Sequence, residues 1–127
     1  MSLKSILLVD DDKAFNFVTR MMLKENIADC RVSEALNGQQ ALDHLMKQDK
    51  SPDIILLDLN MPEVNGFEFL EEFEKLDQRF SETRIFVLTS SLLDEDKAAV
   101  LSHKVVKGYF DKPLTESHIA KILAMAG

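Results

Sequence analysis

Hydrophobic residues in this chain alternate between short unbroken runs and longer periodic stretches. Three runs contain no alternating polar positions, which is typical of strands that are buried on both faces of a parallel sheet. These predicted strands are residues 5–9, 53–57 and 84–88. Two segments of mixed polarity, residues 30–35 and 107–111, are predicted to form the edges of the same sheet.

Stretches with helical periodicity lie between the predicted strands. Apolar residues recur at the spacing of one helix face, and we expect each face to pack in the core. The four sets are Ala14, Val18, Met21 and Met22; Ala41, Leu42 and Leu45; Phe69, Phe73, Leu76 and Phe80; and Ile119, Ile122 and Leu123. A fifth helix over residues 98–101 is predicted to be capped by Asp94, and Thr115 is predicted to cap the last helix. This alternation predicts an α/β fold, a doubly wound parallel sheet with helices on both faces.

The length, net charge and cysteine content of the chain limit the kinds of protein that it can be. The chain has 127 residues without repeats or linkers, so residues 1–127 are predicted to form a single domain. Its net charge of −7 argues against direct binding of nucleic acid, which requires clustered Lys and Arg. Cys30 is the only cysteine, which excludes an internal disulfide. We expect a cytoplasmic protein without membrane insertion, because the sequence has neither a signal peptide nor an apolar run of about 18 residues.

Polar residues follow four of the predicted strands. In an open parallel sheet, ligands bind at the carboxyl ends of the strands, so these residues are expected at one edge. They are Asp10, Asp11 and Asp12 after the first strand; Asp58 and Asn60 after the third; Thr89, Ser90 and Ser91 after the fourth; and Lys112 with Pro113 after the fifth.

The chemistry of this set favours phosphoryl transfer at a magnesium site. Oxygen ligands without His or Cys suit a hard cation such as Mg²⁺, which needs only one or two protein carboxylates. A lysine and a hydroxyl would neutralise and hydrogen-bond a phosphoryl group, and an aspartate can act as the nucleophile. Taken singly, each residue has a plainer explanation, such as helix capping for Asp10 to Asp12 or a solvated side chain for Lys112. The prediction therefore rests on their convergence.

Four segments resemble the receiver domain of two-component response regulators, in the same order and across essentially the whole chain. They are residues 9–11 (VDD), 58–66 (DLNMPEVNG), 88–90 (LTS) and 112–113 (KP). The resemblance implies a flavodoxin-like sheet of five strands in the order 2-1-3-4-5 with five helices. It also implies phosphorelay signalling, in which Asp58 accepts a phosphoryl group from a histidine kinase or a histidine phosphotransfer protein.

The resemblance further implies individual roles around Asp58. Asp11 and Asp58 would ligate Mg²⁺ directly, Asp10 would do so through water, and Asn60 would contribute its backbone carbonyl. Such a domain signals rather than acting as a separate enzyme, although it can catalyse its own phosphorylation and dephosphorylation.

The remaining implied roles concern the response to phosphorylation. Lys112 would contact the phosphoryl group, the Lys112–Pro113 bond would be cis, and the Thr89 hydroxyl would move toward the phosphoryl group. Tyr109 matches an aromatic switch position. Residues 94–126 would change shape and control the binding of a downstream protein. Since the spacing from Thr89 to Lys112 is one residue longer than usual, Ser90 is an alternative switch hydroxyl.

Other hypotheses remain open from the sequence. Asp10, Asp11 and Asp12 satisfy the D-x-D pattern of aspartate-nucleophile phosphatases of the haloacid-dehalogenase type, in which Asp10 would be the nucleophile. A receiver-like scaffold that has lost phosphotransfer is a third possibility.

Gly66 is expected to adopt a backbone angle that other residues avoid. Because the sequence ends at Gly127, just after the last predicted helix, we expect a stand-alone receiver or a fragment of a longer protein.

Overall fold

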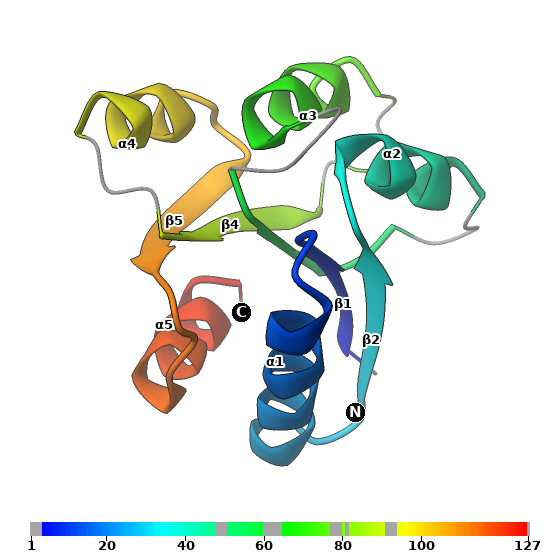
Figure 1. Cartoon of the computed structure of the whole chain (residues 1–127), viewed down its shortest axis with the longest axis vertical. Coiled ribbons are helices and arrows are strands. Elements are labelled where there is room, and N and C mark those ends of the chain that lie inside the picture. The colour runs from blue at the N-terminus through cyan, green and yellow to red at the C-terminus, as the bar shows by residue number, and fades with distance from the viewer. Residues whose placement is uncertain are drawn as a thin grey trace.

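The sheet has the predicted parallel architecture. The computed structural model describes residues 4–47, 51–59, 65–76, 80, 82–90 and 94–126. Within these residues, five parallel strands pair in the order β2-β1-β3-β4-β5, the flavodoxin-like order (Figure 1). They are β1 (Lys4–Val9), β2 (Cys30–Ala35), β3 (Ile54–Leu57), β4 (Arg84–Thr89) and β5 (Val106–Asp111). The two segments of mixed polarity form the edges, as predicted.

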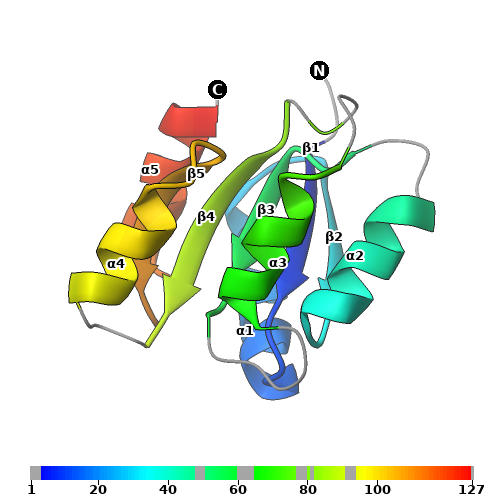
Figure 2. The same ribbon diagram turned by 90° about the horizontal axis from the view of Figure 1, so that it is seen from above.

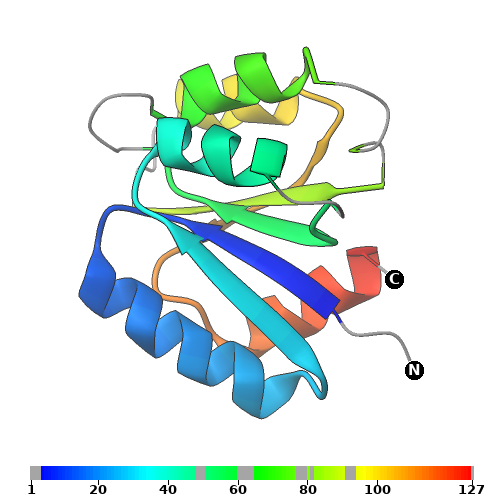
Figure 3. The same cartoon turned by 90° about the vertical axis from the view of Figure 1, so that its right-hand side faces the viewer.

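Helices cover both faces of the sheet. They are α1 (Lys13–Asn26), α2 (Gly38–Lys47), α3 (Gly66–Phe73), α4 (Asp94–Leu101) and α5 (Glu116–Ala126). Figure 3 shows α1 and α5 on one side of the sheet and α2, α3 and α4 on the other, and Figure 2 looks onto the side covered by α2, α3 and α4. Each side has its own hydrophobic core, which contacts alternate residues of the central strands. Burial on both faces explains why β1, β3 and β4 are unbroken apolar runs.

The core-facing side predicted for α1 is wrong for three of its four residues, and only Met22 packs against the core. Ala14, Val18 and Met21 are exposed, whereas the buried residues of α1 are Asn16, Thr19 and Leu23. A polar residue occupies this face because it is hydrogen-bonded there: the Asn16 side-chain amide donates to the backbone carbonyl of Asp10 at 2.9 Å. The helix is thus rotated so that its polar contact with the end of β1 is satisfied.

The predicted stripe from Phe69 to Phe80 continues beyond its helix. Helix α3 ends at Phe73, where i to i+3 hydrogen bonds close the last turn, including one from the Leu76 N–H to the Phe73 carbonyl. Phe80 nevertheless returns to the same core, and its ring meets that of Phe73 at 5.8 Å between centroids. The burial prediction is therefore confirmed, but the helix is shorter than the stripe.

Of the two predicted helix caps, the structure describes the side chain of one, Thr115, and confirms it. The Thr115 hydroxyl accepts a hydrogen bond from the His118 N–H at 3.1 Å, directly before α5. Helix α4 begins at Asp94, whose side chain lies outside the described residues. Among the helices of the described ranges, none is both long and apolar enough to cross a membrane.

Candidate functional site

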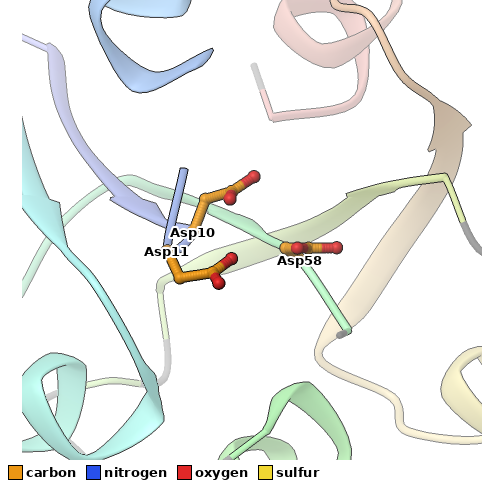
Figure 4. Close-up of side chains that lie close together, drawn as sticks. All are labelled: Asp10, Asp11 and Asp58. Atoms are coloured by element: carbon orange, nitrogen blue, oxygen red, sulfur yellow. The ribbon is translucent and has the colours of Figure 1, made fainter. Parts of the chain in front are cut away.

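Three carboxylates meet at the carboxyl edge of the sheet. Asp10 and Asp11 directly follow β1, and Asp58 directly follows the neighbouring strand β3. Each residue offers an oxygen within 4.8 Å of the others (Figure 4). Asp10 and Asp58 are only 3% and 5% exposed, whereas Asp11 is open to solvent. The register of parallel strands thus brings together the acids that the sequence placed at two strand ends.

Asp58 is also contacted from β4 and from the end of β5. The Thr89 hydroxyl, which is fully buried, donates to Asp58 Oδ1 at 2.8 Å. Lys112 Nζ lies 3.5 Å from Asp58 Oδ2. Ser90 is exposed at the end of β4. Four of the five strands therefore supply a residue to this pocket, and Thr89 rather than Ser90 is the hydroxyl that contacts Asp58.

Asp10 is held by two partners of its own. Lys112 Nζ lies 2.6 Å from Asp10 Oδ2, and the Asp12 N–H donates to Asp10 Oδ1 at 2.9 Å. Asp12 itself caps α1 by accepting a hydrogen bond from the Phe15 N–H at 3.0 Å. Capping thus explains one of the three consecutive acids. This capping role also weakens the phosphatase hypothesis. In the D-x-D pattern, Asp10 contacts Lys112 in the pocket, whereas Asp12 caps α1.

The ionisation of the Lys112–Asp10 pair follows from its burial. Burial raises the pKa of the Asp10 carboxyl, because Lys112 and the Asp12 N–H only partly offset the loss of hydration and Asp58 adds like charge. Burial lowers the pKa of the Lys112 ammonium, but Asp10 and then Asp58 outweigh this effect, so its pKa lies above the ordinary value. Lys112 therefore carries a positive charge at neutral pH.

The carboxylate cluster fits a hard divalent cation. Its donors are oxygens from three acids, and no described Cys or His belongs to the group. Lys112 Nζ lies closer to Asp10 Oδ2, at 2.6 Å, than to Asp58 Oδ2, at 3.5 Å, so Lys112 neutralises Asp10 more directly than Asp58. Asp11 is the acid of the three that is open to solvent. This arrangement is consistent with Mg²⁺, for which two protein carboxylates suffice.

Gly66 is required for space and not for an unusual backbone angle, so the prediction for this residue is wrong. No described glycine has a positive φ. A Cβ at Gly66 would lie 2.6 Å from the Asp58 carbonyl oxygen and 2.7 Å from Leu59 Cα. The Gly66 N–H also donates to the Leu59 carbonyl at 3.1 Å. The start of α3 thus packs directly against the backbone of the Asp58 segment.

The other predicted site residues lie around this pocket or outside the described ranges. Tyr109 on β5 is half-buried against the core that faces α3 and α4, and Lys97 Nζ lies 5.8 Å from its ring centroid. The Lys112–Pro113 peptide bond is cis. The predicted carbonyl ligand, Asn60, and Ser91 lie outside the residues that the structure describes.

Sequence reasoning missed two residues of α1 that contact the pocket. The ring of Phe15 lies against Lys112, with 4.3 Å between Nζ and the ring centroid, and Asn16 holds the carbonyl of Asp10. The sequence does contain a pattern that indicates this face, because Phe15, Met22 and Leu23 also recur at helical spacing. Two apolar stripes therefore compete along α1, and periodicity alone does not select between them.

Comparisons with known proteins agree with the fold. A family model described as "Response regulator receiver domain" matches residues 6–124. The nitrate/nitrite response regulator protein NarL of Escherichia coli K12 is 33% identical over 122 residues, which is 96% of this chain and 54% of NarL. The chain thus spans about half the length of that relative.

Two further proteins are similar along nearly their whole length. The chemotaxis protein CheY of Thermotoga maritima is 30% identical over 124 residues, covering 94% of each chain. The crystal structure of a two-component response regulator from Cytophaga hutchinsonii superposes with a TM-score of 0.87 at 27% identity, covering 99% of this chain and 98% of that one.

Proposed function

Because the chain belongs to the response regulator receiver domain family, we propose that Asp58 accepts a phosphoryl group in a reaction that depends on Mg²⁺. Receiver domains are signalling domains of two-component phosphorelay systems. The observation that carries the proposal is the convergence on Asp58 of two further carboxylates, the Thr89 hydroxyl and the Lys112 ammonium. The donor would be a histidine kinase or a histidine phosphotransfer protein.

The contacts of Asp58 suit a carboxylate nucleophile. Thr89 binds Asp58 Oδ1, while Asp58 Oδ2 faces Lys112. A carboxylate oxygen would attack phosphorus as the bond from phosphorus to the donor nitrogen breaks, and the electron pair of that bond would leave with the imidazole. Lys112 would neutralise charge on the transferred group. When bound by Asp11 and Asp58, Mg²⁺ would supply further neutralisation of phosphoryl oxygens.

The pocket is connected to the surface proposed to change. The Lys112 N–H donates to the Thr89 carbonyl at 3.1 Å, so the ends of β4 and β5 are joined beside Asp58. Helix α4 follows β4 in the chain, and α5 follows Lys112 and Pro113. A change in the contacts of Thr89 or Lys112 would therefore act on the segments that lead into both helices, which supports α4, β5 and α5 as the output surface.

An exposed apolar group on α1 supports a donor that binds beside the acids. Phe17, Val18 and Met21 are 62%, 58% and 49% exposed, and α1 begins directly after the acidic segment. Large apolar side chains that cluster in this way mark sites of protein interaction. We therefore propose that the phosphohistidine donor binds this face of α1.

Mass mapping after phosphorylation tests the acceptor. The chain is incubated with Mg²⁺ and a small phosphodonor, and the added mass is located in peptides. We expect a phosphoryl group on Asp58 and none in Asp58→Asn. Asp53→Asn is a matched control, since Asp53 precedes the same strand at its other end and accepts a hydrogen bond from the Ser5 N–H. A label on Asp10 would instead favour the phosphatase hypothesis, and no label with any small donor would favour the scaffold.

A second experiment separates donor binding from chemistry. Phe17→Ala should slow phosphoryl transfer from a phosphohistidine protein and leave phosphorylation by the small donor unchanged. Met46→Ala is the control, because Met46 is 56% exposed on α2, across the sheet. Equal transfer rates for Phe17→Ala and the unaltered chain would place the donor elsewhere.

A further inference from the structure

The first turn of α1 places an aromatic ring against the lysine of the pocket. Lys112 Nζ lies 4.3 Å from the centroid of the Phe15 ring, a distance at which the ring face attracts a cation. Phe15 is fixed from both sides: its N–H donates to the Asp12 cap, and its side chain packs against the core shared by α1 and α5. The ring is therefore held by the core as well as by its contact with Lys112.

Lys112 is thus surrounded by two acids and the ring. Nζ lies 2.6 Å from Asp10 Oδ2 and 3.5 Å from Asp58 Oδ2, and only 19% of the side chain is exposed. In this state the ammonium is closer to Asp10 than to the proposed acceptor. A phosphoryl group on Asp58 would offer the ammonium another anionic partner and draw Nζ from Asp10 toward Asp58.

An aromatic face suits that shift. A hydrogen bond to a carboxylate fixes the direction of an N–H, whereas the ring attracts the charge without such a direction. The attraction is stronger where the cation is shielded from water, and most of the Lys112 side chain is buried. A lysine held under the ring can therefore exchange one oxygen partner for another without returning to solvent.

We propose that Phe15 is a positioning residue for Lys112: its ring face keeps the ammonium in the pocket while the contact changes from Asp10 to a phosphoryl oxygen on Asp58. This inference rests on the proposed function, because it assigns Phe15 to the same phosphoacceptor site. The proposed role depends on the negative charge of the ring face as well as on the size of the ring. An experiment can separate these two properties.

Graded fluorination at position 15 removes the negative ring face while nearly conserving its volume. The series contains phenylalanine, 4-fluoro-, 3,4,5-trifluoro- and pentafluorophenylalanine, and the probe is beryllofluoride at a fixed Mg²⁺ concentration. We expect affinity for beryllofluoride to fall in that order, by roughly 3- to 10-fold in total. The same series at Phe73 is the control, since this buried ring packs on Phe69 and Phe80 in the core on the other side of the sheet and should leave affinity unchanged.

A second readout needs no phosphoryl analogue. In the protein alone, the ring current of Phe15 should shift the Cε protons of Lys112 upfield in NMR spectra, and Phe15→Leu should abolish this shift. A chain that binds beryllofluoride equally tightly throughout the fluorinated series overturns the role of Phe15, as does the absence of the upfield shift. An unaltered chain that binds no beryllofluoride overturns the proposed function, while the ring-current shift still reports the contact itself.

Discussion

The buried side-chain amide of Asn16 connects α1 to the backbone of the candidate site. Asn16 is fully buried, its Nδ2 donates to the Asp10 carbonyl, and its Oδ1 has no hydrogen-bond partner among the described residues. The side chain lines the cavity behind Asp10 and Asp58. Asn16 thus fixes the backbone from which the first acid projects, at the cost of one unsatisfied buried oxygen.

Asn16→Leu should destabilise the protein. The substitution leaves the Asp10 carbonyl without its donor, which is expected to cost about 1–3 kcal/mol of unfolding free energy. Mg²⁺ binding should also weaken as the acidic segment loosens. Denaturant unfolding and a Mg²⁺ titration measure both effects. Asn26→Leu is the control, because the exposed Asn26 donates to the Met22 carbonyl in the same helix and should cost less than about 0.5 kcal/mol. Equal costs for the two variants would contradict this account of Asn16.

Asp11→Asn should have opposite effects with and without metal. Its carboxylate adds repulsion to a cluster of three acids, so its removal should stabilise the metal-free protein, by at most about 1 kcal/mol because Asp11 is exposed. Affinity for Mg²⁺ should fall. Thermal unfolding with and without Mg²⁺ measures both, with Glu25→Gln on α1 as the control for removal of an exposed charge. A less stable metal-free variant would identify Asp11 as a structural hydrogen-bond acceptor.

At the level of helices and strands, packing decides how each segment is oriented. Helix α1 carries two apolar stripes, and the one with Phe15 and Leu23 packs in the core, on the side where Asn16 donates to the Asp10 carbonyl. The stripe on the outside leaves Phe17 and Val18 exposed beside the acids. Helix α3 has a capping box between Asn65 and Glu68, which starts the helix where Gly66 meets the Asp58 backbone.

Gly66→Ala should disturb the site through the backbone. The added methyl would meet the Asp58 carbonyl oxygen at 2.6 Å, so either α3 or the Asp58 segment has to move. We expect a loss of about 1–3 kcal/mol in unfolding free energy and slower phosphorylation by a small donor. Gly108→Ala is a milder control, because the nearest atoms to its Cβ are aromatic carbons of Phe110 and Phe86 at 3.1 Å. Unchanged stability and rate in Gly66→Ala would show that the close approach is not maintained in solution.

Over the entire sheet, two cores hold the carboxyl ends of the strands in register. Helices on both faces bury the strands, and the parallel register brings the segments after β1, β3, β4 and β5 to one edge. The acids at this edge come together only in the folded chain. A ligand that binds them should therefore stabilise the whole fold.

Mg²⁺ should raise the melting temperature. Binding to the folded state alone adds about 2.7 kcal/mol of stability when the free ion is 100 times its dissociation constant. Scanning calorimetry with and without millimolar Mg²⁺, at matched ionic strength, measures the effect, and Asp58→Asn should reduce it. A melting curve that does not respond to Mg²⁺ would argue against a metal site at Asp10, Asp11 and Asp58.

Much of this architecture follows from the order of residues along the chain. Unbroken apolar runs predict strands buried on both faces, and parallel strands place their carboxyl ends together, so Asp10, Asp58, Thr89 and Lys112 were expected at one edge. These inferences hold because alternation, periodicity and chain direction are local properties.

Contacts between segments that are distant in the sequence are decided only by the tertiary structure. The pairing of Lys112 with Asp10, the ring of Phe15 against Lys112 and the close approach of Gly66 to Asp58 join residues from different strands and helices. Periodicity along α1 permits two orientations of that helix, and in the fold the buried face is the one with Leu23 and with Asn16, which donates to the Asp10 carbonyl. Local sequence patterns indicate which residues can be buried. The rotation of a helix about its axis depends on the packing contacts and hydrogen bonds that it makes with the neighbouring strands.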